Sequence, residues 1–209
     1  MTTPLFRYVA LGDSTGVGVG ASNDGGYPER LYRRLKAAGV PAGILNLAQS
    51  GATTSDLVRT QLSKAVAAKP ALITLGIGSN DLWRMVPPTT FSSNLQRIAD
   101  QLERSGAHVV VSTLVDLTLA PIAAMVESLL GVPLAMVGQR IAELNEQLLA
   151  LSKRPRFEVV NLFDLTHQEK HRVTQLFSSD GFHPSSLGYD RWAETLWPRV
   201  EKIAALRRV

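Results

Sequence analysis

The sequence contains no cysteine. The chain therefore forms no disulfide bonds, binds no metal through thiolates and has no thiol nucleophile. The lack of disulfides leaves the compartment open. Because the first dozen residues lack the charged, apolar and cleavage regions of a secretory signal, we expect a cytoplasmic location by default, or secretion if a leader was removed.

Long apolar runs and clustered charges are also scarce. The most apolar stretch, Val109 to Val137, is interrupted by two acidic residues, a glycine and two prolines, which argues against stable membrane insertion. The net charge is +4, but the basic residues are spread along the chain apart from a pair at Arg207 and Arg208. A nucleic-acid-binding domain would concentrate them on one face, so we expect no nucleic-acid partner.

The sequence does contain a regular alternation of apolar runs and amphipathic segments. Its 209 residues, 45% of them hydrophobic, suffice for one domain with a sizeable core, and we expect residues 1–209 to form a single domain. The alternation predicts an α/β fold with a parallel sheet and right-handed crossovers. The five predicted strands are a run that ends at Gly12 and the runs Gly43–Ala48, Ala71–Ile77, His108–Thr113 and Phe157–Asn161.

Apolar residues recur at helical spacing between these strands and after the last one. We expect helices at 27–38, at about 55–69, around 91–102, around 141–149, and at the C-terminus around 187–203, where Pro198 should kink or divide the helix. The segment 114–137 is apolar but broken by prolines and a glycine. It is a candidate substrate-pocket insertion that lines or covers the site, and a surface insertion that only completes the core is the alternative.

Four polar loops lie at the predicted carboxyl edge of the sheet, where ligands bind in open α/β folds. They contain Ser14, Gly51, Asn80 and the pair Asp180 and His183. A serine hydroxyl becomes a nucleophile when a neighbouring imidazole takes its proton, and a carboxylate orients that imidazole. We therefore predict Ser14 as nucleophile, His183 as base and Asp180 as the orienting acid.

Acyl transfer also needs donors for the oxyanion that forms in the transition state. The backbone N–H groups of Ser14 and Gly51 and the side-chain amide of Asn80 are the candidates. Asp13 and Asp81 are expected to hold their turns rather than to react. Trp83 either forms a wall of an acyl pocket or is an ordinary core or surface aromatic.

Two other motifs match the glycine-rich start of the chain. Residues 12–16 fit the G-x-S-x-G elbow of α/β-hydrolases, but in that fold the serine follows several strands, whereas here it follows the first. Residues 16–21 fit the G-x-G-x-x-A dinucleotide fingerprint. That motif requires a helix that opens within the glycines and an acidic residue after the second strand, and the sequence has neither.

The remaining histidines offer little for catalysis or metal binding. His167 and His171 have the spacing of metal ligands on a helix, but Gln168 stands where the H-E-x-x-H motif requires glutamate. His108 opens a predicted strand and is expected to be a satisfied edge residue. We therefore expect no metal site and assign the base to His183.

Taken together, four blocks occur in order on the predicted loops: Gly12-Asp13-Ser14, Gly51, Gly78-Ser79-Asn80-Asp81 and Asp180-Gly181-Phe182-His183. In these blocks the chain resembles the SGNH hydrolase superfamily, also called GDSL-type esterases and lipases. The resemblance implies a flavodoxin-like three-layer α/β/α fold, a Ser-His-Asp triad, no cofactor, and hydrolysis of small-molecule carboxylic esters.

The compact size is similar to the lysophospholipase and acyl-thioesterase branch of that superfamily. The apolar segment 114–137 favours a lipophilic acyl group. Two alternatives stay open at this point: a carbohydrate O-deacetylase of the same superfamily, and a non-catalytic flavodoxin-like module that binds a nucleotide, a flavin or an ester. The sequence does not indicate the leaving group or the oligomeric state.

Overall fold

A computed structural model describes residues 5–22 and 24–206. Its core is a five-stranded sheet in the order β2-β1-β3-β4-β5, with every neighbouring pair parallel. The predicted α/β class and five-stranded parallel sheet are thus confirmed. The strands are β1 (Phe6–Gly12), β2 (Ala42–Asn46), β3 (Leu72–Gly76), β4 (His108–Ser112) and β5 (Phe157–Val160).

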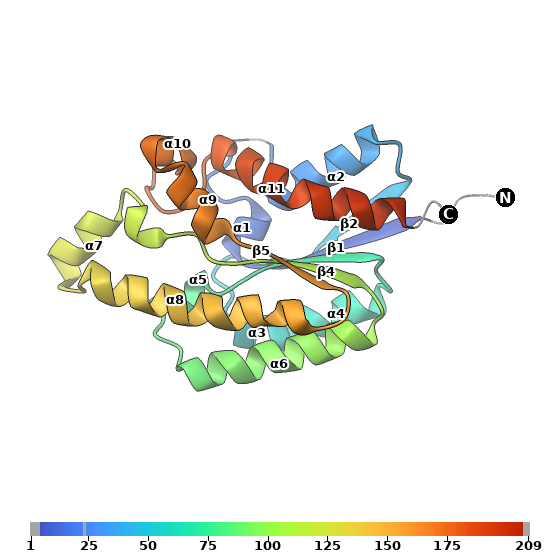
Figure 1. Ribbon diagram of the computed structural model, residues 1–209, viewed down its shortest axis with the longest axis horizontal. Coiled ribbons are helices and arrows are strands. Elements are labelled where there is room, and N and C mark those ends of the chain that lie inside the picture. The colour runs from blue at the N-terminus through green and yellow to red at the C-terminus, as the bar shows by residue number, and fades with distance from the viewer. Residues whose placement is uncertain (1–4, 23, 207–209) are drawn as a thin grey trace.

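Helices cover both faces of the sheet (Figure 1). Elements α5 (Ser79–Trp83), α7 (Ala123–Leu130) and three short 3₁₀ turns, η1 (Leu117–Leu119), η2 (Leu151–Lys153) and η3 (Lys170–Arg172), complete the connections. One layer contains α1 (Ser14–Val17), α2 (Tyr27–Ala37), α9 (Leu162–Gln168), α10 (Val173–Leu176) and α11 (Ser186–Ala205). The other contains α3 (Thr54–Thr60), α4 (Leu62–Ala67), α6 (Pro88–Arg104) and α8 (Leu134–Ala150).

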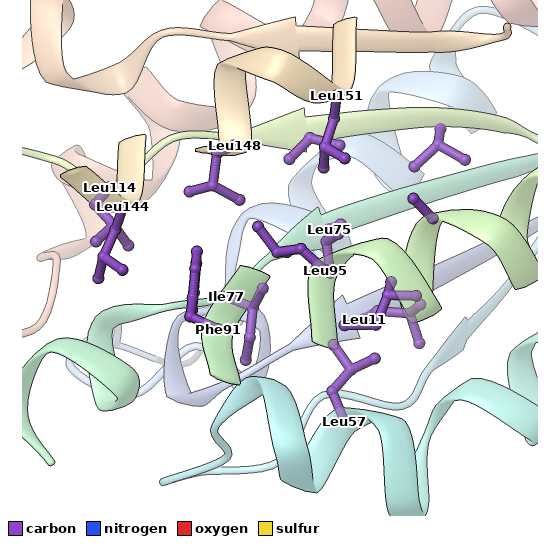
Figure 2. Close-up of a cluster of buried hydrophobic side chains, with 14 of the residues drawn as sticks. Leu11, Leu57, Leu75, Ile77, Phe91, Leu95, Leu114, Leu144, Leu148 and Leu151 are labelled. Carbon is purple, nitrogen blue, oxygen red and sulfur yellow. The ribbon is translucent and has the colours of Figure 1, made fainter. Parts of the chain in front are cut away.

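The central strands are apolar on both faces because each face packs on a helical layer. Successive side chains of a strand point to opposite faces, so in β1 Val9 and Leu11 join one core cluster, and Tyr8 and Ala10 join the other. Figure 2 shows the first cluster, in which side chains from the sheet meet those of the layer formed by α3, α4, α6 and α8. The two cores explain the nearly continuous apolar runs of the sequence.

The sheet is tightest where β1 and β3 end. Gly12 pairs with Gly76, and a Cβ atom added to Gly12 would lie 2.2 Å from the carbonyl oxygen of Gly76. The φ angle of Gly12 is also +152°, a value that side chains rarely allow. Glycine is therefore required at the position from which the loop of Ser14 departs.

The sequence predicts one helix at about 55–69, but the structure has two helices there, α3 and α4, which meet at Gln61. The side chain of Gln61 is completely buried and turns toward the sheet. Its Oε1 accepts from the N–H of Gly12 at 3.0 Å, and its Nε2 donates to the carbonyl of Gly12 at 2.8 Å. The backbone φ of −109° at Gln61 departs from helical values where α3 gives way to α4.

The structure also bears on two other expectations, which concern Pro198 and the segment 114–137. Pro198 does not divide the last helix, since α11 runs without interruption from Ser186 to Ala205. Leu196 and Val200, on either side of the proline, are both completely buried in the same cluster, so packing favours helix on both sides of Pro198. The segment 114–137 carries two short helical elements, η1 and α7, as connections of this length often do, and its last residues belong to α8.

Within residues 5–22 and 24–206, no helix combines the length and the apolar character needed to cross a membrane.

The buried amide of Gln61 generates a stability prediction. Gln61→Ala leaves the N–H of Gly12 without its acceptor, and an unsatisfied buried group of this kind costs about 1–3 kcal/mol of unfolding free energy. Urea unfolding of the variant measures that loss. Gln139→Ala is the matched control, because Gln139 is exposed on α8 and its loss should change stability by less than about 0.5 kcal/mol. Equal stability of the two variants would contradict the role assigned to Gln61.

Candidate active site

Ser14 lies in a tight turn directly after β1. Asp13 caps the four-residue helix α1, and its Oδ1 accepts from the backbone N–H of Thr15 at 3.0 Å and from the Thr15 hydroxyl at 2.8 Å. Gly18, in the left-handed conformation, ends the helix. Ser14 occupies the first helical position, where the backbone N–H has no acceptor within the helix. The turn thus presents both a hydroxyl and a backbone donor, and Asp13 holds it as expected.

His183 connects Ser14 to Asp180. Its Nε2 lies 3.0 Å from the Oγ of Ser14, and its Nδ1 lies 2.7 Å from the Oδ2 of Asp180. The three side chains come from opposite ends of the chain, yet the structure brings them together in the geometry that a serine hydrolase requires. With Asp180 accepting from Nδ1–H, Nε2 of the neutral ring is free to accept the hydroxyl proton of Ser14.

The carboxylate of Asp180 is fixed by its own loop. Its Oδ1 accepts from the backbone N–H groups of Phe182 and His183 at 2.8 and 2.9 Å and from the hydroxyl of Ser178 at 2.8 Å. Although partial burial acts in the opposite direction, the hydrogen bonds from His183 and these donors hold the pKa of Asp180 well below its usual range. The charged form of Asp180 is therefore favoured beside the imidazole.

The loop that carries His183 is closed at its base. Phe177 and Pro184 form an antiparallel bridge, and the N–H of Ser178 donates to the carbonyl of His183 at 2.8 Å. Gly181 lies between them with a φ of +70°, a conformation that favours glycine. This closure fixes the direction in which the imidazole points, because the backbone on both sides of His183 is held.

Of the predicted oxyanion donors, Ser14 and Asn80 line the cavity, whereas Gly51 is not among its described lining residues. Asn80, in the first turn of α5, lines the cavity in front of Ser14, and its amide donates to the carbonyl of Ala52 at 3.0 Å. That bond uses one of the two amide N–H groups and orients the other. Gly51 is not among the described residues that line this cavity, and its carbonyl accepts from Arg84 at 2.9 Å.

Asp81, next to Asn80, holds the loop together through hydrogen bonds from Thr54. It is completely buried, and its carboxylate accepts from the N–H of Thr54 at 2.9 Å and from the Thr54 hydroxyl at 2.6 Å. Burial raises the pKa of Asp81, and the bonds from Thr54 act against that rise. The interaction ties the start of α5 to the start of α3, as the expectation of a turn-holding role requires.

The cavity at Ser14, here called the reaction cavity, has one polar side and one apolar side. Leu114, Val115 and Leu117 bring the beginning of the segment 114–137 to it, and Phe177 and Phe182 complete the apolar wall. Trp83 is not among the described lining residues. It packs edge-on against Phe182 with 5.8 Å between ring centroids, and therefore supports the wall from behind.

Among the residues of the reaction cavity that sequence reasoning missed are two large aromatic residues, Phe177 and Trp192. The periodicity placed Trp192 in the core of the last helix, and it does stack on Tyr27 with 4.7 Å between centroids. Its Nε1 also donates to Ser112 at the end of β4, at 3.0 Å, which brings the ring to the sheet edge. The position of Phe177, directly before the polar loop of Asp180, was the signal available for that residue.

The three histidines that we did not assign to catalysis, His108, His167 and His171, are not among the described residues that line the reaction cavity. The Nε2 of His167 lies 2.8 Å from a carboxylate oxygen of Asp116, in the segment after β4. No group of three or more potential metal ligands occurs in the part of the chain that the structure describes. His167 therefore connects α9 to the neighbouring segment.

Comparison with known proteins gives consistent results. The sequence model of the GDSL-like Lipase/Acylhydrolase family matches residues 10–191. Esterase TesA of Pseudomonas aeruginosa is 24% identical over 197 residues, which cover 93% of this chain and 88% of that protein. An arylesterase of Vibrio mimicus is 29% identical over 105 residues, covering 50% of this chain and 52% of the relative. A crystal structure of TesA superimposes with a TM-score of 0.75 at 23% identity, covering 94% of this chain and 99% of that one.

The buried carboxyl of Asp13 predicts a pH-dependent stability. Burial raises the pKa of Asp13 from 3.8 to about 6, against the bonds from Thr15. Between these values the folded protein binds more protons than the unfolded chain, so stability falls as the pH rises through this interval. Asp13→Asn removes the titration, and its stability relative to wild type should increase between pH 4 and pH 7 by at most roughly 3 kcal/mol.

Urea unfolding at several pH values across that range measures the difference. Asp24→Asn, at an exposed carboxylate in a neighbouring loop, is the control and should follow the wild-type curve. A constant difference between Asp13→Asn and wild type at all pH values would show that Asp13 does not titrate with a raised pKa.

Proposed function

The chain belongs to the GDSL-like lipase/acylhydrolase family, and we propose that it hydrolyses carboxylic esters through an acyl-enzyme formed on Ser14. It is an esterase/lipase-type serine hydrolase that acts on small-molecule esters. The observation that carries the proposed mechanism is the continuous chain of hydrogen bonds from Ser14 through His183 to Asp180, at 3.0 and 2.7 Å. Family membership also argues against the alternative of a non-catalytic binding module.

In the proposed first half-reaction, the Oγ of Ser14 attacks the carbonyl carbon of the ester while its proton passes to Nε2 of His183. Asp180 stabilises the imidazolium that forms and does not itself take the proton. Collapse of the tetrahedral intermediate breaks the bond to the leaving oxygen, which receives the proton from Nε2. In the second half-reaction His183 deprotonates a water molecule, whose attack releases the acid and restores the Ser14 hydroxyl.

The negative charge on the substrate oxygen needs donors in both half-reactions. We assign this role to the backbone N–H of Ser14 and to the second amide N–H of Asn80, with the N–H of Gly51 as the third predicted donor. The bond between Asn80 and the carbonyl of Ala52 supports this assignment, because it fixes the amide before substrate binds. Donors that are already oriented stabilise the transition state without a cost of reorganisation.

We further propose that residues 1–209 act as one hydrolase domain, in which the segment 114–137 belongs to the substrate pocket. The contacts of Leu114, Val115 and Leu117 with the reaction cavity support this role. The apolar wall that they form favours an ester with an apolar acyl group, as in the lysophospholipase and acyl-thioesterase branch. Comparison of acetylated sugars with p-nitrophenyl esters as substrates distinguishes this assignment from a carbohydrate deacetylase.

Removal of the proposed nucleophile or base should abolish most turnover. We expect Ser14→Ala and His183→Ala to lower kcat for p-nitrophenyl acetate by about 10⁴-fold or more while the protein stays folded. Asp180→Ala should lose less, since removal of the orienting acid costs less than removal of the base. Ser152→Ala and His171→Ala, at exposed positions that are not among the described residues lining the reaction cavity, are matched controls. Wild-type rates in His183→Ala would overturn the assignment of the base.

Loss of the side-chain donor should slow the chemical step without removing it. A single oxyanion donor is worth about 10²–10³-fold in kcat, so Asn80→Ala should fall in this range with a much smaller change in KM. The stability of the variant is measured in parallel, because Asn80 also bonds to Ala52. A rise in KM with an unchanged kcat would instead assign Asn80 to substrate binding.

A further inference from the structure

Two side chains at α5 hold the loop that contains Gly51. The amide of Asn80 donates to the carbonyl of Ala52 at 3.0 Å, and Nη2 of Arg84, the residue that caps the end of α5, donates to the carbonyl of Gly51 at 2.9 Å. Asn80 and Arg84 are four residues apart, so they lie on the same side of the helix, one turn from each other. Two consecutive carbonyl groups of one loop are thus bound to α5.

The loop is a tight turn whose form depends on Gly51. The N–H of Ala52 donates to the carbonyl of Gln49 at 3.1 Å, which closes a four-residue β-turn, here called the Gly51 turn. Gly51 is its third residue and has a φ of +77°, whereas the φ of Ser50, the second residue, is not positive. This combination is that of a type II turn, which favours glycine at the third position.

The type of this turn sets the direction of the Gly51 N–H. Type I and type II turns differ chiefly in the orientation of the peptide group between the second and third residues. Here that group joins Ser50 to Gly51, so its N–H is the third donor predicted for the oxyanion. A change of turn type would point this N–H to the opposite side, and a shift of the turn would also move the Ala52 carbonyl that orients Asn80.

We propose that Arg84 is a positioning residue for the oxyanion donors, which acts by holding the Gly51 turn against α5. The inference rests on the proposed function, because it adds a residue to the same acyl transfer. With its carbonyl bound to the guanidinium, Gly51 has little freedom to rotate, so its N–H and the amide of Asn80 keep one mutual arrangement before substrate binds. Donors arranged in advance stabilise the transition state without a cost of reorganisation.

The surroundings of Arg84 separate this role from a role in folding. Its side chain is 58% exposed, and its Nη1 lies 4.0 Å from the carboxylate of Asp56. Substitutions at exposed positions of this kind usually change stability little. Arg59 offers a matched control, because it is also exposed and pairs with Asp56 at 2.6 Å, but is not among the described partners of the Gly51 turn.

The experiment measures kcat and KM for p-nitrophenyl acetate in wild type and in Arg84→Met, Arg84→Lys and Arg59→Met. Methionine keeps an unbranched side chain but removes the donors. Arg84→Met should therefore lower kcat by about tenfold, less than the roughly 10²–10³-fold effect of removing an oxyanion donor outright, with little change in KM. Lysine can still donate to the carbonyl, so Arg84→Lys should have an intermediate kcat. Arg59→Met should match wild type.

A double-mutant cycle with Gly51→Ala tests the route by which Arg84 acts. Alanine disfavours the positive φ of Gly51, and its Cβ atom would lie 3.4 Å from Nη2 of Arg84, so the substitution changes the turn through backbone strain rather than through a clash. In the Gly51→Ala background, Arg84→Met should lower kcat by a smaller factor, because the turn has already been released. Equal factors in the two backgrounds would contradict this route and overturn the inference.

Urea unfolding of each variant separates positioning from folding. If Arg84→Met does not fold, Arg84→Lys decides the result, and its kcat must then fall below that of Arg59→Met. The inference is overturned if Arg84→Met keeps the wild-type kcat, whatever its KM, or if high salt, which screens an exposed charge, lowers the wild-type kcat to that of Arg84→Met. Acetate hydrolysis that persists in Ser14→Ala, or is absent from wild type, would instead refute the proposed function.

Discussion

The close approach of β1 and β3 at Gly12 and Gly76 fixes the edge of the sheet on which the site is built. The two strands come so near that Gly12 tolerates no side chain, because its Cβ atom would lie 2.2 Å from the carbonyl oxygen of Gly76. Ser14 follows Gly12 by two residues, and Asn80 follows Gly76 by four, so one backbone pairing sets the distance between the hydroxyl and the amide. Gln61 then holds the backbone of Gly12 from the helical layer.

Two carboxylates flank the serine and histidine, and their surroundings separate their roles. Asp13 is buried, and burial disfavours its charged form although its carboxylate accepts hydrogen bonds from the backbone N–H and the hydroxyl of Thr15. Asp180 is more exposed and accepts several hydrogen bonds, which favour its charged form. A negative charge that persists at low pH is what an imidazolium needs beside it. The electrostatics therefore support Asp180, and not the carboxylate adjacent to Ser14, as the orienting acid.

Much of the fold and of the candidate site was predictable because the signals are local. Strands that are buried on both faces appear in the sequence as apolar runs. The motifs that contain Ser14 and Asn80 directly follow β1 and β3, and the motif that contains His183 directly precedes α11. The rest depends on distant contacts. The break at Gln61 arises from bonds to a strand far away in sequence, and the continuity of α11 through Pro198 arises from packing. Trp192 reaches the site because of its bond to Ser112, which periodicity does not reveal.

The separation of Ser14 from His183 by 169 positions has a consequence for biosynthesis. β1 and α1 leave the ribosome early, whereas the hairpin of His183 and α11 leave it late. α11 packs along α2, and the Tyr189 hydroxyl donates to the carbonyl of Val19 at 2.7 Å, which fastens the late segment to the serine loop. A nascent chain thus carries an inert serine hydroxyl until the segment of His183 has been synthesised, and the proposed hydrolase becomes reactive toward esters only when α11 docks.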